Sequence, residues 1–171
     1  GDGSPLVSDA SPTHLYTTSG NYTVTVTVTT SLGIGTNTQN ITIYQIPTAT
    51  QPQDILQCDS DNNGIHNFDL TSNESIILNG QNASLYTVRY FANATDYANN
   101  LPIATPSSYP NLVAYQQQTI IAEVTNNANR ECNATTTFTI DVFDTPRPAT
   151  TITNLSTCDN TTFGTSTDGR V

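Results

Sequence analysis

QCDSDNNGIHNFDL, residues 57–70, is the stretch from which the organisation of the chain follows. It opens on Cys58, carries acidic and amide side chains in its middle and closes on Phe-Asp-Leu. The opening returns about a hundred residues later as Cys158-Asp159-Asn160, and residues 168–171 resemble its second half. A motif that returns along a chain predicts a tandem array of similar modules.

The composition indicates an all-β extracellular protein. Thr and Val alternate, and Tyr and Phe are common, as in strands. None of the 171 residues is Lys, four Arg face fourteen Asp plus Glu, and the net charge is −10. That charge repels phosphate backbones and anionic lipids, so we expect no nucleic-acid partner. No apolar run approaches the ~20 residues that span a bilayer, so we expect no direct membrane insertion, and Gly1 indicates that secretion signals lie elsewhere.

The three cysteines predict disulfides, because the outside of a cell is oxidising. If Cys58 and Cys132 bracket one module and bond to each other, Cys158 opens the next module and its partner lies beyond Val171. Closing a loop of that length would stabilise the fold by roughly 4 to 5 kcal/mol on the chain-entropy model. The alternative is that all three are reduced core residues.

The first segment, residues 1–47, ends in an antiparallel pair of strands. Strict alternation puts Tyr22, Val24, Val26 and Val28 on one face, which predicts a half-buried strand. Residues 40–44 indicate the returning strand. This segment resembles the C-terminal two thirds of a PKD domain, an immunoglobulin-like β-sandwich. The matching motifs are Gly1-Asp2-Gly3, His14-Leu15-Tyr16 and Gly20-Asn21-Tyr22-Thr23-Val24. The resemblance implies that His14 packs as a structural residue.

Proline-rich joints at residues 46–52 and 144–148 enclose one complete module, residues 53–143, and residues 149–171 start the next repeat. We expect few contacts across these joints. Within the module we predict about seven short strands, including 75–78, 85–91, 119–124 and 135–143, and one helical turn over 93–98. This pattern predicts tandem immunoglobulin-like β-sandwich modules.

The module resembles the repeat of SprB-type gliding adhesins and other large repeat proteins that Bacteroidota export by type IX secretion. The likeness rests on Cys58-Asp59, Gly64, Phe68-Asp69-Leu70-Thr71, Val88-Arg89-Tyr90-Phe91, Asp96-Tyr97-Ala98, Cys132 and Phe138-Thr139-Ile140. It implies a cell-surface filament for adhesion or gliding motility. Its partners would be neighbouring repeats of the same chain, and surface polysaccharide or other filament chains.

The acidic stretch fits the first half of a calcium loop, D-x-[DN]-x-[DN]-G. Leu70 replaces the bidentate Glu, so a helix-loop-helix hand is excluded and a calcium-stiffened β-loop is the candidate. Its ligands would be Asp59, Asp61, Asn63, the Ile65 carbonyl and Asp69. The alternative is an Asx-turn, in which these side chains bond nearby backbone amides. No cofactor is required in either case.

Eight Asn-x-Ser/Thr triplets are candidate glycosylation sites. They start at Asn21, Asn40, Asn73, Asn82, Asn93, Asn133, Asn154 and Asn160. The alternative is chance, because the chain is rich in Asn and Thr.

No constellation of nucleophile, base or paired carboxylates assembles, so the chain is not expected to be an enzyme. The leading hypothesis is an adhesive filament segment. The alternative is a carbohydrate- or protein-binding module, in which Tyr86, Tyr97, Tyr109 or Tyr115 form a stacking platform. Arg89 could serve such a site, or it pairs across strands with Glu123.

Overall fold

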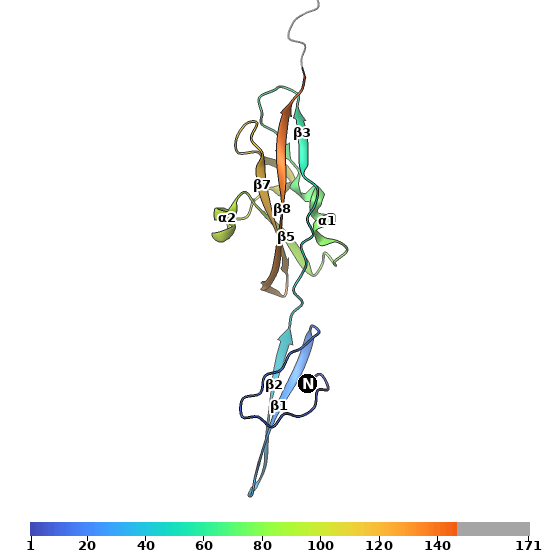
Figure 1. Cartoon of the computed structure of the whole chain (residues 1–171), viewed down its shortest axis with the longest axis vertical. Helices are drawn as coiled ribbons and strands as arrows, with labels where there is room; N and C mark the ends of the chain where they lie inside the picture. Colours follow the sequence, from blue (N-terminus) through green and yellow to red (C-terminus); the bar gives the residue numbers. More distant parts are fainter. Residues whose placement is uncertain (147–171) are drawn as a thin grey trace, which may run out of the picture.

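A computed structural model describes residues 1–146 of the chain. These residues form an elongated arrangement, with an N-terminal hairpin at one end, a linker, and a larger module from which the chain leaves at the far end (Figure 1). The predicted next repeat, residues 149–171, lies outside the described residues and includes Cys158, Asn154 and Asn160.

The hairpin consists of β1 (Gly20–Thr30) and β2 (Gly33–Ile43), which pair antiparallel along their whole length. The predicted pair of strands is therefore confirmed. The prediction that the valine face of this strand is half-buried is wrong, since Val26 and Val28 are each 58% exposed. Within the described residues, no second layer covers this face.

A four-stranded sheet with the order β3-β8-β7-β5 forms the centre of the module. Its strands are β3 (Ile55–Asp59), β5 (Tyr86–Phe91), β7 (Gln118–Asn126) and β8 (Asn129–Asp144). β5, β7 and β8 form an antiparallel series, whereas β3 runs parallel to β8. The first and last strands of the module are therefore neighbours that point the same way.

The core lies on one face of this sheet. β7 and β8 contribute alternate apolar residues, and a second layer closes over them. That layer contains β4 (Asn67–Phe68), η1 (Leu70–Asn73), α1 (Glu74–Leu78), η2 (Pro106–Ser108) and β6 (Tyr109–Pro110). Fully buried residues include Phe68, Leu70, Ile77, Ile120, Val124 and Ile140. The all-β class is confirmed, but the second layer is a two-residue β4–β6 pair with helical turns instead of a full sheet.

The predicted strand at residues 75–78 is wrong, because these residues form helix α1. The Asp69 side chain accepts a hydrogen bond from Thr71 N and begins the helical segment, and Asn79 ends it in the left-handed conformation at φ 44°. The predicted helical turn is confirmed as α2 (Ala94–Ala98), whose cap Asn93 accepts a hydrogen bond from Asp96 N.

The linker contradicts the expectation of few contacts, since it packs along the module. Gln81 bonds both the N–H and the carbonyl of Thr48, at 3.0 and 2.8 Å. Thr50 N donates to Ile77 O at 3.0 Å, and Ala49 packs against the core. The buried cluster lies entirely between Phe68 and Val142, so a protein of residues 45–146 retains the complete core and is expected to fold by itself.

Candidate functional site

The two ends of the module carry its distinctive chemistry. We call the region of Cys58, residues 59–65, residues 111–115 and residues 143–145 the exit end, because the chain leaves the module there (Figure 1). The opposite linker end contains the β7–β8 turn and residues 129–132, and the preceding hairpin lies beside it.

At the exit end the acidic loop forms successive Asx-turns. Asp59 Oδ1 accepts from Asp61 N at 3.2 Å, and Asp61 Oδ1 accepts from Asn63 N at 3.2 Å. Asn63 Oδ1 in turn accepts from Ile65 N at 2.7 Å. The second Asp59 oxygen accepts from Gly64 N at 2.6 Å, so the loop is closed by its own side chains.

The same loop also forms hydrogen bonds with Thr145, where the chain leaves the module. Thr145 Oγ1 donates to Asp59 O at 2.6 Å. Asn62 completes the contact in both directions, since its Nδ2 donates to Thr145 O and its Oδ1 accepts from Thr145 N, each at 3.2 Å. We call these residues the exit clasp. They fix the direction in which the chain leaves the module.

The calcium prediction is not supported by this geometry. The side chains of Asp59, Asp61 and Asn63 accept hydrogen bonds from backbone N–H groups. Asp69 accepts from Thr71 N at 3.0 Å in the helical segment that follows β4. Among residues 1–146, no group of three or more acidic, His or Cys residues is arranged to hold a metal ion. Calcium binding stays a prediction, while the Asx-turn alternative describes the observed loop.

Two pKa values are shifted at the exit end. Burial opposes ionisation of Asp59, but hydrogen bonds from the Gly64 and Asp61 N–H groups outweigh it and lower the pKa of Asp59 below its usual value. A hydrogen bond to the Asp144 carboxylate, reinforced by partial burial, raises the pKa of Tyr115 to about 12. The folded exit end therefore favours an ionised Asp59 and a neutral Tyr115.

The predicted Cys58–Cys132 disulfide is wrong. Both thiols are free, and Cys58 pairs in register with Phe143 at the exit end of β8. Cys132 lies at the other end of the same strand, roughly 35 Å away at the usual rise per residue. A disulfide requires a Cα–Cα distance below about 7 Å. Neither thiol is buried, so the alternative of reduced core residues does not fit these two cysteines either.

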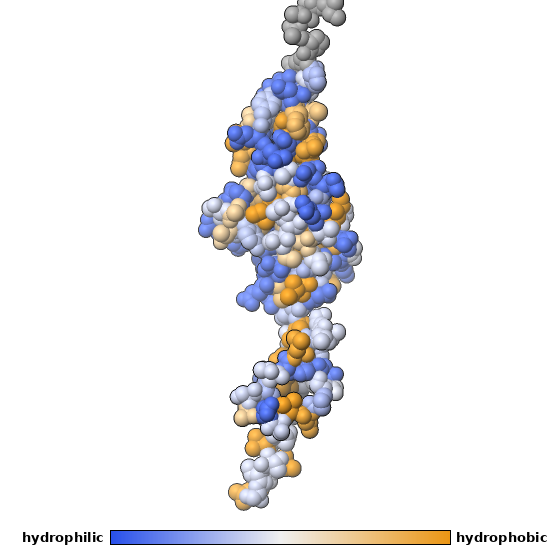
Figure 2. Space-filling view, in the orientation of Figure 1, coloured by the Kyte–Doolittle hydropathy of each residue, from blue (hydrophilic) through white to orange (hydrophobic). Residues whose placement is uncertain are grey.

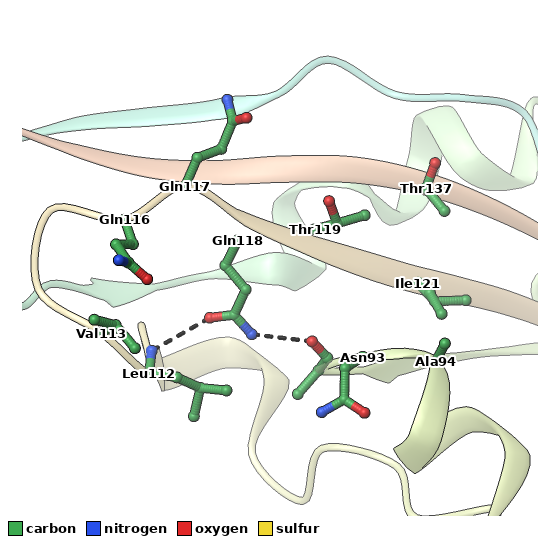
Figure 3. Close-up of a pocket in the computed structure, with 11 residues that line it drawn as sticks. Asn93, Ala94, Leu112, Val113, Gln116, Gln117, Gln118, Thr119, Ile121 and Thr137 are labelled. Carbon is green, nitrogen blue, oxygen red and sulfur yellow. Dashed lines mark hydrogen bonds between the residues drawn. The ribbon is translucent and has the colours of Figure 1, made fainter.

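A pocket of about 500 Å³ lies on the outer face of the sheet, between the start of α2 and residues 112–118 (Figure 3). Gln118 forms one wall of the pocket. Its side-chain amide donates to Ala92 O and accepts from Leu112 N, and so joins the two segments on either side of the pocket. Leu112, Val113 and Ile121 give the pocket an apolar lining, and no charged residue is among its lining residues.

Comparison with known families decides the assignment. Residues 54–148, more than half of the chain, match the family described as Flavobacterium inter-domain disulphide bond domain. The chain belongs to this family. Residues 1–44 match the PKD domain, which confirms that resemblance. Neither a curated protein nor a solved structure matches the chain.

The inter-domain disulphide bond domain and its PKD neighbour together identify a β-rich module of an extracellular surface protein, consistent with a Bacteroidota source. Within residues 1–146, no helix has the length and apolar character needed to cross a membrane. The family match covers residues 54–148, whereas the sequence predicted a module at residues 53–143.

The glycosylation triplets fall into two groups within the described part of the chain. Asn73, Asn93 and Asn133 use their Nδ2 as a hydrogen-bond donor to Gln53, Asp96 and Arg130. Asn21, Asn40 and Asn82 are exposed and accept through Oδ1, from Thr42, Thr23 and Ser84. Glycosylation itself stays a prediction, and the geometry favours the second group.

The stacking platform is not assembled in the inter-domain disulphide bond domain. Tyr86 and Tyr109 are buried, Tyr97 packs edge-on against Phe91 with ring centroids 5.1 Å apart, and Tyr115 packs beside Gly64. The tyrosines therefore do not form one exposed surface.

Arg89 pairs with Glu123 across strands, which confirms the second of the two roles predicted for this arginine. Its Nε donates to Glu123 Oε2 at 2.9 Å, and its Nη1 donates to Asn100 Oδ1 at 2.7 Å. Glu123 is only 4% exposed, so this pair neutralises a buried carboxylate.

Sequence reasoning missed Asn62, Asn111 and Thr145, the polar residues that build the exit end. Asn111 Nδ2 donates to Gly64 O at 2.8 Å and so ties a distant loop to the acidic stretch. The available signal was the concentration of Asn around the glycine, because Asn and Asp side chains favour such local backbone bonds.

Proposed function

We propose that the chain is a load-bearing segment of a long cell-surface filament that mediates attachment or gliding motility. The role is mechanical and not catalytic. The single observation that carries this proposal is the parallel pairing of β3 with β8, from Ile55↔Ile140 to Asp59↔Asp144.

This pairing suits a protein pulled from its two ends. The chain enters the module at the linker end and leaves at the exit end (Figure 1). Tension therefore draws β3 and β8 in opposite directions along their length, which loads their ladder hydrogen bonds together in shear. Thr139 N donates to Asp54 Oδ1 at 2.7 Å at one end of this contact, and the exit clasp closes the other.

The family description adds a covalent element. Its name refers to a disulfide between domains, and the wide separation of Cys58 and Cys132 fits bonds that leave the module better than one within it. Neighbouring repeats are then the main partners. Surface polysaccharide and other filament chains are further partners for the adhesive step, and type IX secretion is the proposed export route.

A pulling experiment tests the mechanical role. Residues 45–146 are stretched between handles at both chain ends, and in a second geometry between residue 45 and Cys132 of a Cys58→Ser variant. The end-to-end geometry should need the higher force, because the second geometry separates bonds one at a time. Equal forces would contradict the shear argument.

A matched pair of variants sharpens this test. Asp54→Ala removes the acceptor of Thr139 N and should lower the end-to-end unfolding force. Glu131→Ala removes an exposed carboxylate of β8 that makes no side-chain hydrogen bond within the described residues, and should leave the force unchanged. Deleting the encoding gene and measuring attachment and gliding of the cells would test the cellular role separately.

A further inference from the structure

The pocket on the outer face of the sheet has a wall that is fixed by the fold. Gln118 projects from β7 toward Leu112 and the start of α2 (Figure 3). Its Nε2 donates to Ala92 O at 3.1 Å and to Tyr109 Oη at 2.8 Å, and its Oε1 accepts from Leu112 N at 3.3 Å. Asn93 is held as the cap of α2. These two amides are occupied within the fold, so they shape the pocket and leave ligand binding to other groups.

Other polar side chains of the lining have no partner in the described part of the fold. Gln116, Thr119 and Thr137 are exposed, and their side chains form no hydrogen bond within residues 1–146. Hydroxyl and primary amide groups both donate and accept hydrogen bonds. The aliphatic side chains of Leu112 and Ile121 line the same pocket. The pocket therefore combines an apolar surface with hydrogen-bonding groups that are free to meet a ligand. Figure 2 shows how apolar and polar residues alternate over one face of the module.

The lining favours an uncharged ligand. No charged residue is among the lining residues, and the chain carries a net charge of −10. The chain as a whole repels an anion, and a cation finds no carboxylate among the lining side chains. The volume of about 500 Å³ lies within the range of roughly 300 to 1,000 Å³ that is usual for small-molecule sites. The ligand is therefore a small neutral molecule, or a short part of a larger neutral one.

The position of the pocket on the sheet favours a sugar over a peptide. An extended peptide commonly binds by adding a strand to a free sheet edge. β7 contributes Gln118, Thr119 and Ile121 to the pocket, and it is paired with β5 on one side and β8 on the other. Its backbone groups are therefore taken, and a ligand in the pocket meets side chains. Sugar hydroxyls, which donate and accept, match the free amide and hydroxyl groups.

We propose that this pocket binds a short neutral saccharide, as part of an uncharged surface polysaccharide. The site rests on the proposed filament function and names the ligand chemistry of its adhesive step. Gln116, Thr119 and Thr137 bind the sugar hydroxyls, and Leu112 and Ile121 pack against the C–H groups of the ring. Because its polar groups are few, one site binds weakly. Several sites on one polysaccharide raise the avidity by roughly 10² to 10⁴.

Saccharide binding by the whole chain tests the proposal. Residues 1–171 are titrated with maltose, cellobiose, lactose and N,N′-diacetylchitobiose, while the backbone amide resonances are followed by NMR. Sialylated lactose and an uncharged, end-blocked peptide of Asn and Thr represent the other ligand classes. We expect saturable binding of a neutral disaccharide, with the shifted amides confined to the pocket segments at residues 92–94, 112–121 and 137.

A matched pair of threonine variants locates the binding. Thr137 and Thr135 are both exposed residues of β8 on the same face of the sheet, but only Thr137 lines the pocket. Thr137→Val should raise the dissociation constant by roughly 2- to 12-fold, the effect of losing one neutral hydrogen bond. Thr135→Val should leave it unchanged. Gln116→Ala repeats the test from a different segment of the chain, and thermal unfolding checks that each variant is folded.

The proposal would be overturned if none of these neutral disaccharides bound saturably at millimolar concentration. Equal affinities of the Thr137→Val and Thr135→Val proteins would also overturn it. Preferred binding of the sialylated sugar or of the peptide would assign the pocket to another class of ligand. None of these outcomes changes the unfolding force in the pulling experiment, so failure of the sugar site and failure of the load-bearing role are distinguishable.

Discussion

Thr145 and Asp59 are joined where the chain leaves the module. Thr145 Oγ1 and Thr145 N both donate to the carbonyl of Asp59, at 2.6 and 3.3 Å. Asp59 is the last residue of β3 and pairs with Asp144. The strand that begins the module therefore sets the direction in which the chain departs from it.

Asn62→Gly should loosen the exit clasp. Asn62 has φ 57°, so glycine keeps the backbone conformation while two hydrogen bonds to Thr145 are lost. We expect the free energy of unfolding to fall by about 1 to 2 kcal/mol. Chemical denaturation measures it, and amide hydrogen exchange at Thr145 should accelerate. An unchanged exchange rate would show that the clasp does not order the exit.

Gly64→Ala should destabilise the exit end more than a matched glycine change elsewhere. A Cβ at Gly64 would meet Tyr115 Cδ2 at 2.7 Å, and the residue has φ +79°. Gly80 has φ +80° with nothing within 4 Å, so Gly80→Ala carries the backbone strain alone. We expect losses of about 2 to 4 kcal/mol and about 1 kcal/mol respectively. Thermal and urea unfolding measure both losses. If Gly64→Ala and Gly80→Ala lower the free energy of unfolding equally, Tyr115 moves aside to admit the Cβ.

Stability should fall in acid partly through Asp59. Its pKa is lowered in the folded protein, so the unfolded state binds a proton first as the pH drops. The stabilisation is complete above the unfolded pKa of about 4 and is lost as the pH falls through the folded value. Urea unfolding measured from pH 7 to pH 2 should show a shallower decline for Asp59→Asn. Identical pH profiles would exclude this contribution.

Arg89→Ala should be costly because it leaves Glu123 buried without its partner. Thr125 Oγ1 still donates to Glu123 at 3.2 Å, but a hydroxyl does not replace the charge. We expect a loss of about 3 to 5 kcal/mol, and a smaller loss for the double change Arg89→Met with Glu123→Leu. A double-mutant cycle with both single variants measures the coupling. Additive effects would show that the pair is not coupled.

Local patterns predicted the parts of the fold that depend on local chemistry. The alternation in residues 22–29 identified β1, and the Asn93 cap identified α2. The short apolar run at residues 75–78 misled, because a run of that length fits a strand or a helix and the caps at Asp69 and Asn79 decide between them.

The candidate site was harder to predict because it depends on long-range register. Cys58 and Cys132 bracket the module in sequence, which suggested a bond between them. The parallel pairing of β3 with the end of β8 separates them, and nothing in either strand's own sequence specifies that pairing. The exit clasp likewise joins Asn62 to Thr145 across the whole module.

The placement of the two chain ends on opposite sides of the module bears on how such proteins change in evolution. Further copies joined through these two ends would lengthen the stalk, because the chain enters the module on one side and leaves it on the other. Duplication of a single gene segment would then carry the tip further from the cell without any change to the parts already present.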